Sequence, residues 1–205
     1  MTRRVLFAVA VGASALFLLV LGAAVRPLVI SETAVPAPVL TSTEIGFVQD
    51  MTAHHQQALL MVERLAADAD PTVGRLAGQI ADTQRLEIGT MLGWLRLAGA
   101  TPTNPSPMAW MPTGHHHTAS ATMPGMATRA DLDALALARG ADADALFLRL
   151  MYRHHRGGIV MAQAFDELST GGPVEQAARD MIGTQSQESG IIGLLVARLG
   201  ATATG

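Results

Sequence analysis

The stretch Phe47-Val-Gln-Asp-Met51-Thr-Ala-His54-His55-Gln-Gln-Ala58-Leu-Leu-Met61 returns later as Phe147-Leu-Arg-Leu-Met151-Tyr-Arg-His154-His155-Arg-Gly-Gly158-Ile-Val-Met161. The Phe, the first Met, both His and the last Met recur at one offset of 100 residues, which indicates an internal duplication. Further along the chain, Gln84-Arg-Leu-Glu87 is echoed by Gln185-Ser-Gln-Glu188, one residue out of step. The sequence therefore predicts two similar halves, each with a Met and a His pair.

Both copies lie in apolar, helix-favouring sequence, where each residue advances about 100° around the helix axis. With Met51 as the reference, His55 lies roughly 40° to one side and His54 roughly 60° to the other. At least one imidazole of each pair therefore shares a helix face with the preceding Met. Ala58 and Gly158 are small, which would let another helix approach beside the site.

The composition excludes several classes of function. The net charge is -3, and acidic and basic residues are interspersed along the chain without a basic cluster. Nucleic acid is therefore not expected as a partner. The absence of cysteine excludes disulfides, thiolate metal sites and a cysteine nucleophile. Eleven Met and seven His leave thioether and imidazole as the soft ligands.

The sequence predicts that residues 1–26 form an export segment. Arg3 and Arg4 precede an uncharged apolar run over residues 5–25, and Arg26 follows it. The basic start is expected to stay in the cytoplasm while the rest of the chain lies outside. The run is long for a signal peptide and suits a single-pass membrane anchor, whereas the small residues Gly22-Ala23-Ala24 would serve as a cleavage site. We expect an anchor, or a secreted or periplasmic protein if the segment is cleaved.

The remaining chain predicts an all-α, antiparallel four-helix bundle over residues 41–205, preceded by a proline-containing tether over residues 27–40. Thr41-Ser-Thr-Glu44 fits a capping box and opens a first helix that we expect to run to about Asp70. Pro71 begins the second helix, which is expected to reach Leu97. The two hairpins are residues 43–99 and 142–199, with the second pair of helices at roughly 142–170 and 173–199. The pseudo-twofold axis would bring the first and third long helices together.

The linker over residues 100–140 is rich in Met and His and lacks periodicity until Thr128-Arg-Ala-Asp131 caps a short helix. Thioether and imidazole in one exported segment suit Cu(I). A flexible tether that happens to contain soft residues is the alternative. The candidate auxiliary ligands in this linker are His115, His116, His117, Met123 and Met126.

Two interpretations of the paired histidines stay open. In one, they cap helices or hydrogen-bond inside a helical core. In the other, they share a metal ion, which is an economical way to satisfy four buried imidazoles. The methionines further along the helices, Met61, Met91, Met161 and Met181, suit core packing. Glu87 and Glu188 would either fix an imidazole tautomer or lie at the surface.

Other chemistries lack their motifs. The chain has no Glu-x-x-His pair for a di-iron centre and no His-Glu-x-x-His for a zinc protease. It also lacks a Gly-rich phosphate loop and a nucleophile elbow. The sequence therefore offers no catalytic set, and we expect no enzymatic activity.

The duplicated Phe-x-x-x-Met-x-x-His-His, the Gln-x-x-Glu that follows and the Met-Pro-Gly-Met before the second half resemble the domain of unknown function 305 family over about residues 43–198. The resemblance implies a ferritin-like helical bundle, exported in bacteria, with no agreed enzymatic activity and with copper binding or tolerance in some members. One departure is Arg156-Gly157, which stands where the first copy has Gln56-Gln57. An arginine there would repel a cation if it pointed inward.

Together these patterns predict an exported, membrane-tethered protein that binds and buffers or delivers copper, preferably Cu(I), without catalysis. The rival interpretation is a structural or interaction module of the cell envelope that binds another envelope protein and uses the His pairs as core hydrogen-bonding residues. The predicted core site consists of Met51, His54, His55, Met151, His154 and His155.

Overall fold

The computed structural model describes residues 2–29, 38–111 and 123–202. The chain divides into two compact units, residues 1–38 and residues 39–205. The linker residues His115, His116 and His117 lie outside the described residues.

The first unit is the helix α1 (Thr2–Val29). Its segment Phe7–Val25 has 19 residues and a mean hydropathy of 2.4, and none of it is buried. This helix is long and apolar enough to cross a membrane, and a signal sequence has the same length and composition. Cleavage and anchoring therefore both stay predictions.

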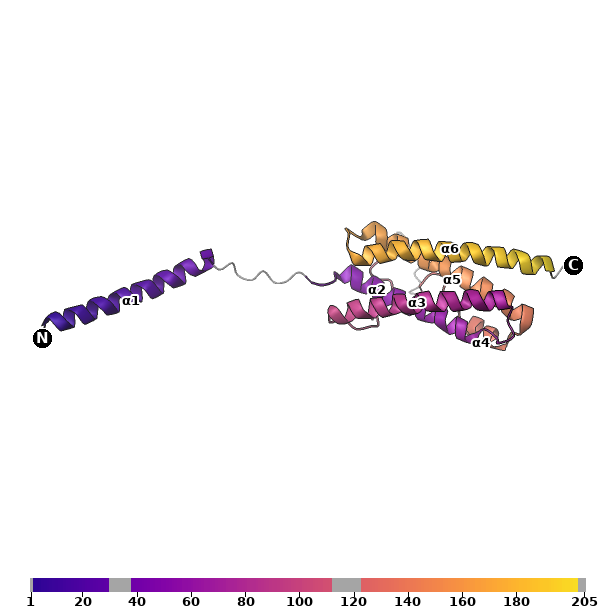
Figure 1. Cartoon of the computed structure of the whole chain (residues 1–205), viewed down its shortest axis with the longest axis horizontal. Helices are drawn as coiled ribbons and strands as arrows, with labels where there is room; N and C mark the ends of the chain where they lie inside the picture. Colours follow the sequence, from indigo (N-terminus) through magenta and orange to yellow (C-terminus); the bar gives the residue numbers. More distant parts are fainter. Residues whose placement is uncertain (1, 30–37, 112–122, 203–205) are drawn as a thin grey trace. The chain divides into compact units, whose positions relative to one another are not determined.

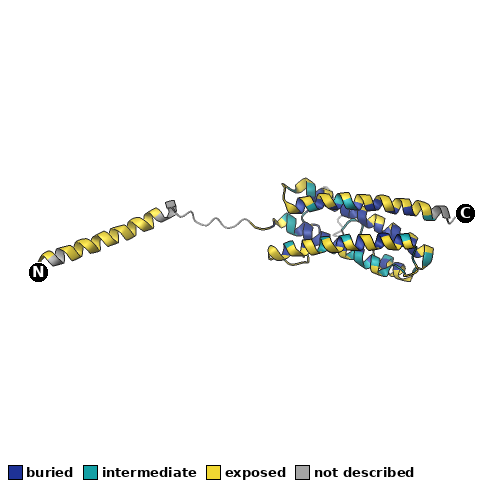
Figure 2. Ribbon diagram, viewed as in Figure 1, coloured by how far each residue is buried: buried dark blue, intermediate teal, exposed yellow. Residues whose placement is uncertain are grey.

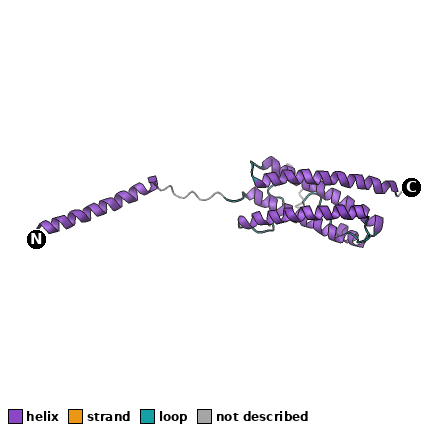
Figure 3. Ribbon diagram, in the orientation of Figure 1, coloured by secondary structure: helices purple, strands orange, loops and turns teal. Residues whose placement is uncertain are grey.

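The second unit is a four-helix bundle, which confirms the predicted fold class (Figure 1). Its long helices are α2 (Ser42–Arg64), α3 (Pro71–Leu97), α5 (Gly140–Leu168) and α6 (Pro173–Thr202), and the short α4 (Arg129–Leu137) lies in the linker. The described residues are helices and loops without a strand (Figure 3). Helix α2 packs on α3, α5 packs on α6, and α2 contacts α5 between the two hairpins.

The helix starts follow from local capping. The Thr41 hydroxyl accepts a hydrogen bond from the Glu44 N–H at 3.2 Å, and the Glu44 carboxylate accepts one from the Thr41 N–H at 2.6 Å. These two bonds form the predicted capping box. Pro71 is the first residue of α3, as predicted, and Asp70 caps that helix by accepting from the Thr72 N–H at 2.7 Å.

The predicted end of the first helix near Asp70 is wrong, because α2 ends at Arg64 and Leu65 is extended. The cause is a tertiary contact. The buried carboxylate of Asp144 on α5 accepts hydrogen bonds from the Asp70 N–H at 3.1 Å, which fixes the turn before α3. A helix continued to Asp70 would use that N–H for its own ladder.

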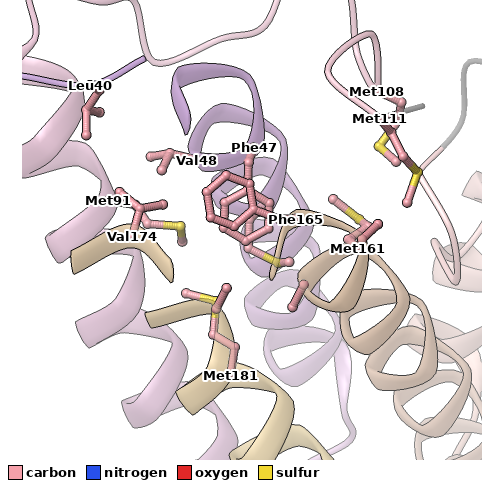
Figure 4. Packing of buried hydrophobic residues seen from close by; sticks show 14 of the residues in the cluster. Leu40, Phe47, Val48, Met91, Met108, Met111, Met161, Phe165, Val174 and Met181 are labelled. Atoms are coloured by element: carbon pink, nitrogen blue, oxygen red, sulfur yellow. The ribbon is translucent and has the colours of Figure 1, made fainter. Parts of the chain in front are cut away.

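The bundle is held by two buried apolar clusters, one towards each end. Figure 2 shows that the buried residues of the helices face the interior of the bundle. In the first, the rings of Phe47 and Phe165 stack with centroids 4.2 Å apart, and methionines surround them (Figure 4). The second contains Phe147, Leu148 and residues of α3 and α4. All four methionines predicted to pack the core are in these clusters: Met91, Met161 and Met181 in the first and Met61 in the second.

The start of the linker is tied to α2 by a buried carboxylate. Asp50 accepts hydrogen bonds from the Met108 N–H at 2.7 Å and from the Trp110 indole N–H at 2.8 Å. Burial raises the pKa of Asp50, and these two hydrogen bonds oppose that rise. The segment up to Met111 is therefore a packed part of the bundle.

The later linker crosses between the two halves and explains why they differ at one position. The Gln57 side-chain amide pairs with the backbone of Ala127, accepting from its N–H at 2.6 Å and donating to its carbonyl at 2.9 Å. On α5 the equivalent residue is Gly157, where an added Cβ would overlap the Pro124 carbonyl. The same linker passes over two similar helices. Helix α2 binds it with the Gln57 amide, whereas α5 has Gly157 beneath it and therefore no side chain there.

We expect Gly157→Ala to lower the free energy of unfolding by about 1–3 kcal/mol, since the methyl group would push the linker away from α5. The measurement is urea denaturation of residues 39–205. Gly183→Ala on α6 is the control, because a Cβ there contacts nothing within 4 Å, and it should leave the protein as stable or about 0.5–1 kcal/mol more stable. Equal effects of the two substitutions would show that the linker does not press on Gly157.

Candidate metal centre

The four paired histidines form a buried group between α2 and α5. His54, His55, His154 and His155 are each 0% exposed. The rings of His54 and His154 face each other across the two helices, with centroids 3.8 Å apart and planes tilted by 30°. Within each pair the rings are farther apart, at 6.4 Å in the first and 6.3 Å in the second. The repeat therefore places one inner histidine from each half in ring contact.

The outer histidines are held by carboxylates on the neighbouring helices. His55 Nε2 lies 2.7 Å from Glu87 Oε2 on α3, and His155 Nε2 lies 2.7 Å from Glu188 Oε2 on α6. Both carboxylates therefore take the tautomer-fixing position that the sequence proposed for them. Carboxylate–imidazole contacts of this kind orient the rings of metal-binding histidines.

The inner histidines are held by backbone carbonyls instead. His54 Nε2 donates to the Pro124 carbonyl at 3.0 Å, and His154 Nε2 donates to the His54 carbonyl at 2.9 Å. A carbonyl only accepts, so Nε2 carries the hydrogen in both rings. In the neutral ring, Nδ1 then keeps its lone pair.

None of the four Nδ1 atoms has a hydrogen-bond partner among the described residues. The same holds for the side-chain amides of Gln84 and Gln185 and for the Ser189 hydroxyl. Buried polar atoms without partners are costly and uncommon, and they concentrate here on the His-bearing layer and the helices behind it. The Gln-x-x-Glu echo predicts a role for Glu alone. The recurrence of Gln84 and Gln185 in the same motif is the sequence feature that points to these buried amides.

Burial and mutual repulsion keep the inner imidazoles neutral. Burial, together with the charge of the neighbouring His55, lowers the pKa of His54 to about 3, although the hydrogen bond to the Pro124 carbonyl opposes the shift. Burial also holds the pKa of His154 well below its ordinary value, with His54 as the next contribution. Two neutral rings with unprotonated Nδ1 atoms can accept a metal ion without first losing a proton.

The other predicted ligands are distributed around this layer. Met51 and Met151 are fully buried but belong to the two different apolar clusters. Met123 and Met126 are half-buried in the linker that supplies the Pro124 carbonyl. Arg156 is exposed to solvent, so its charge does not point into the His layer.

As the side chains lie, the described residues contain no group of three or more His, Asp or Glu that could hold a metal ion. The outer carboxylates are occupied by the outer imidazoles, which leaves imidazole nitrogen and thioether sulfur as the available donors. This donor set is soft and suits Cu(I) better than it suits Mg²⁺, Ca²⁺ or Mn²⁺. In its chemistry, the site therefore fits copper.

The geometry defines a class of protein: a helical bundle of two similar hairpins around a buried layer of neutral imidazoles. The sequence matches the family described as "Domain of unknown function (DUF305)" over residues 44–192. The chain belongs to the DUF305 family. No curated protein matches it.

Solved structures of similar proteins share this fold. A DUF305 protein from Streptomyces coelicolor, described as secreted, has 38% identity and a TM-score of 0.71, covering 78% of this chain and 94% of that one. A DUF305 fragment from Deinococcus radiodurans has 32% identity and a TM-score of 0.62, covering 77% and 97%. CopM in its Cu(II)-bound form has 27% identity and a TM-score of 0.59, covering 76% and 96%. CopM in its Cu(I)-bound form has 26% identity and the same TM-score, covering 77% and 98%.

The low pKa of His54 predicts acid sensitivity of the metal-free bundle. Between pH 6.5 and about 3, His54 binds a proton in the unfolded chain but stays neutral in the folded chain. The free energy of unfolding therefore falls as the pH falls through this window. From pH 6 to pH 5, His54 alone should contribute a loss of about 1 kcal/mol. Urea denaturation at the two pH values measures this loss.

His54→Asn is the matched variant for this prediction. It should reduce the loss between pH 6 and pH 5 by about 1 kcal/mol, because the unfolded variant has one proton fewer to gain. Identical pH dependence of the variant and the unaltered protein would contradict a buried, neutral His54.

Proposed function

We propose that this protein is an exported copper-binding protein that buffers or delivers the metal and catalyses no reaction. The observation that carries the proposal is the set of four buried imidazoles whose Nε2 atoms are engaged and whose Nδ1 atoms have no partner among the described residues. Copper binding would turn these unsatisfied nitrogens into ligands. The two copper-bound CopM structures with the same fold support copper as the cargo.

The chain's own residues would divide the work of holding copper. The inner rings of His54 and His154 would supply neutral nitrogen donors. Glu87 and Glu188 would orient the outer rings, as carboxylates do behind metal-binding histidines. The thioethers of Met51 and Met151, one helical turn before the His pairs, would add soft donors that favour Cu(I).

The linker would act as the exchange segment. Met123 and Met126 flank the residue whose carbonyl holds His54, so copper arriving at the linker would be next to the inner rings. His115, His116 and His117 precede them in the chain and would extend the same set of soft ligands. Ligands that exchange suit a protein that hands metal on.

Export supports the same role. The apolar α1 and the secreted DUF305 relative both favour a bundle that works outside the cytoplasm. We propose that α1 stays as a membrane anchor, since its apolar segment is long enough to span a bilayer.

The second candidate function, a structural or interaction module, is favoured by the hydrogen bonds themselves. The bond from His154 to the His54 carbonyl joins α5 to α2, and the bond from His54 to Pro124 joins α2 to the linker. In this alternative the imidazoles knit the bundle and bind no metal. The two functions differ in whether the Nδ1 atoms bind copper.

The test is an anaerobic competition titration of residues 39–205 with Cu(I) and a chromophoric Cu(I) chelator. The double variant Met51→Leu/Met151→Leu keeps the side-chain volume and should weaken copper binding by roughly tenfold or more. The matched control is Met61→Leu/Met161→Leu, since these methionines are equally buried but are assigned to packing. The control should bind copper as the unaltered protein does.

Two further variants locate the site. His54→Asn/His154→Asn should abolish tight binding, and circular dichroism establishes that the bundle still folds. A linker variant with His115, His116 and His117 changed to Asn and Met123 and Met126 changed to Leu should keep the core site. Loss of binding only in the linker variant would move the site out of the core, and no binding by the unaltered protein would favour the structural module.

A further inference from the structure

A surface groove of about 600 Å³ lies between the start of α5 and the end of α6, on the part of α5 that precedes the second His pair. Its floor and walls are mostly apolar, with Ala145 and Leu148 from α5 and Ile192 and Val196 from α6. Arg149 and Tyr152 are the polar groups at one end. Small-molecule sites typically have this volume and this balance of apolar wall and few polar groups.

The first half of the bundle shows what this groove looks like when it is filled. The offset of 100 residues relates Ile45 to Ala145. Ile45 packs against the first apolar cluster. The second half has only a methyl group at this place, where Ala145 lines the groove, so part of the groove is the space that a branched side chain fills in the first half.

Helix α6 shows the same contrast with α3. The Gln-x-x-Glu echo relates Leu95 to Val196 and Leu92 to Gly193. Leu95 is 1% exposed, whereas Val196 is 49% exposed. Leu92 is itself 37% exposed, so the wall that the first half covers and the second half leaves open is the one at Leu95 and Val196.

In the part of the chain that the structure describes, the segment that follows α3 covers the equivalent place in the first half. After α3, Ala98 and Ala100 pack against the first cluster, and the Thr101 carbonyl accepts from the Gln49 amide at 2.6 Å. Among the described residues, no segment after α6 returns over the second groove. The residue equivalent to Gln49 is Arg149, which is exposed.

We propose that this groove binds an amphiphile with an acyl chain and an anionic head, of the kind that a long-chain carboxylate represents. The acyl chain would occupy the space that Ile45 fills in the first half. The head would lie at Arg149 and Tyr152, because Asp142 lines the opposite end of the groove, seven residues or about 10 Å earlier on α5. The head-to-tail direction follows from this separation of charges.

The proposal assigns specific tasks to the groove residues. The guanidinium of Arg149 pairs with the anion, and the Tyr152 hydroxyl donates a hydrogen bond to it. Val196 and Leu148 contact the chain.

Dodecanoate is the probe, titrated into residues 39–205 by calorimetry and by displacement of 1-anilinonaphthalene-8-sulfonate. This unit contains both apolar clusters, and the Deinococcus radiodurans fragment of the same family covers 77% of the chain. The expected result is one bound dodecanoate per chain. Ala145→Ile/Gly193→Leu, which restores the side chains of the first half, should weaken binding by roughly tenfold or more.

Two controls separate the groove from general effects. A Cβ at Gly193 or at Gly183 contacts nothing within 4 Å, so Gly183→Leu elsewhere on α6 is a matched substitution that should leave binding unchanged. Arg149→Gln, which installs the residue of the first half, should weaken dodecanoate binding and leave dodecanol binding unchanged.

Three results would overturn the proposal. They are no binding of dodecanoate by the unaltered protein, equal binding by the filled variant, and a dimer in light scattering that Ala145→Ile/Gly193→Leu converts to a monomer. The last result would mean that a second copy of the chain covers the groove.

Discussion

The structure depends on the hydrogen bonds that the Nε2 atoms of four buried histidines make with oxygen acceptors. Two of these bonds end on backbone carbonyls, one in the linker and one in α2 itself, and two end on carboxylates of the outer helices. They satisfy one nitrogen of each ring, fix its orientation and leave the other nitrogen turned away from those acceptors. The same contacts therefore join α2, α3, α5, α6 and the linker and define the candidate copper site. Substitutions at these residues change both stability and metal binding, which is why the methionine variants are the cleaner probes.

A second consequence of the repeat is that one linker serves two similar halves. The linker lies on both inner helices, and Gln57 and Gly157 are different solutions to the same contact. The start of the linker is held by Asp50 on α2, where the equivalent residue of the second half is Leu150. The start of the linker consequently covers the first half, and the second half is more open. The exposed Arg156 and the groove at Arg149 both lie on the second half.

The sequence predicts the elements of this fold well where the cause is local. The capping residues Thr41 and Thr128 and the helix-starting Pro71 place three of the helix starts, because a cap needs only neighbouring residues. The end of α2 is missed, because the deciding partner of Asp70 is Asp144 on another helix. For the site, the spacing places the histidines on one layer and suggests the glutamates behind them. It cannot reveal that Pro124 and His54 supply carbonyl acceptors, because every residue has a carbonyl and only the tertiary fold selects one.

The central claim is that the inner rings carry their hydrogen on Nε2 and offer Nδ1 to copper. Long-range ¹H–¹⁵N correlation spectra of the ¹⁵N-histidine-labelled bundle measure this directly, before and after anaerobic addition of one equivalent of Cu(I). For His54 and His154, the account predicts neutral Nε2–H tautomers at pH 7 and a shift of the Nδ1 resonances when copper is added, while Nε2 stays protonated. Nδ1–H tautomers in the metal-free protein, or Nδ1 resonances unchanged by Cu(I), would contradict it.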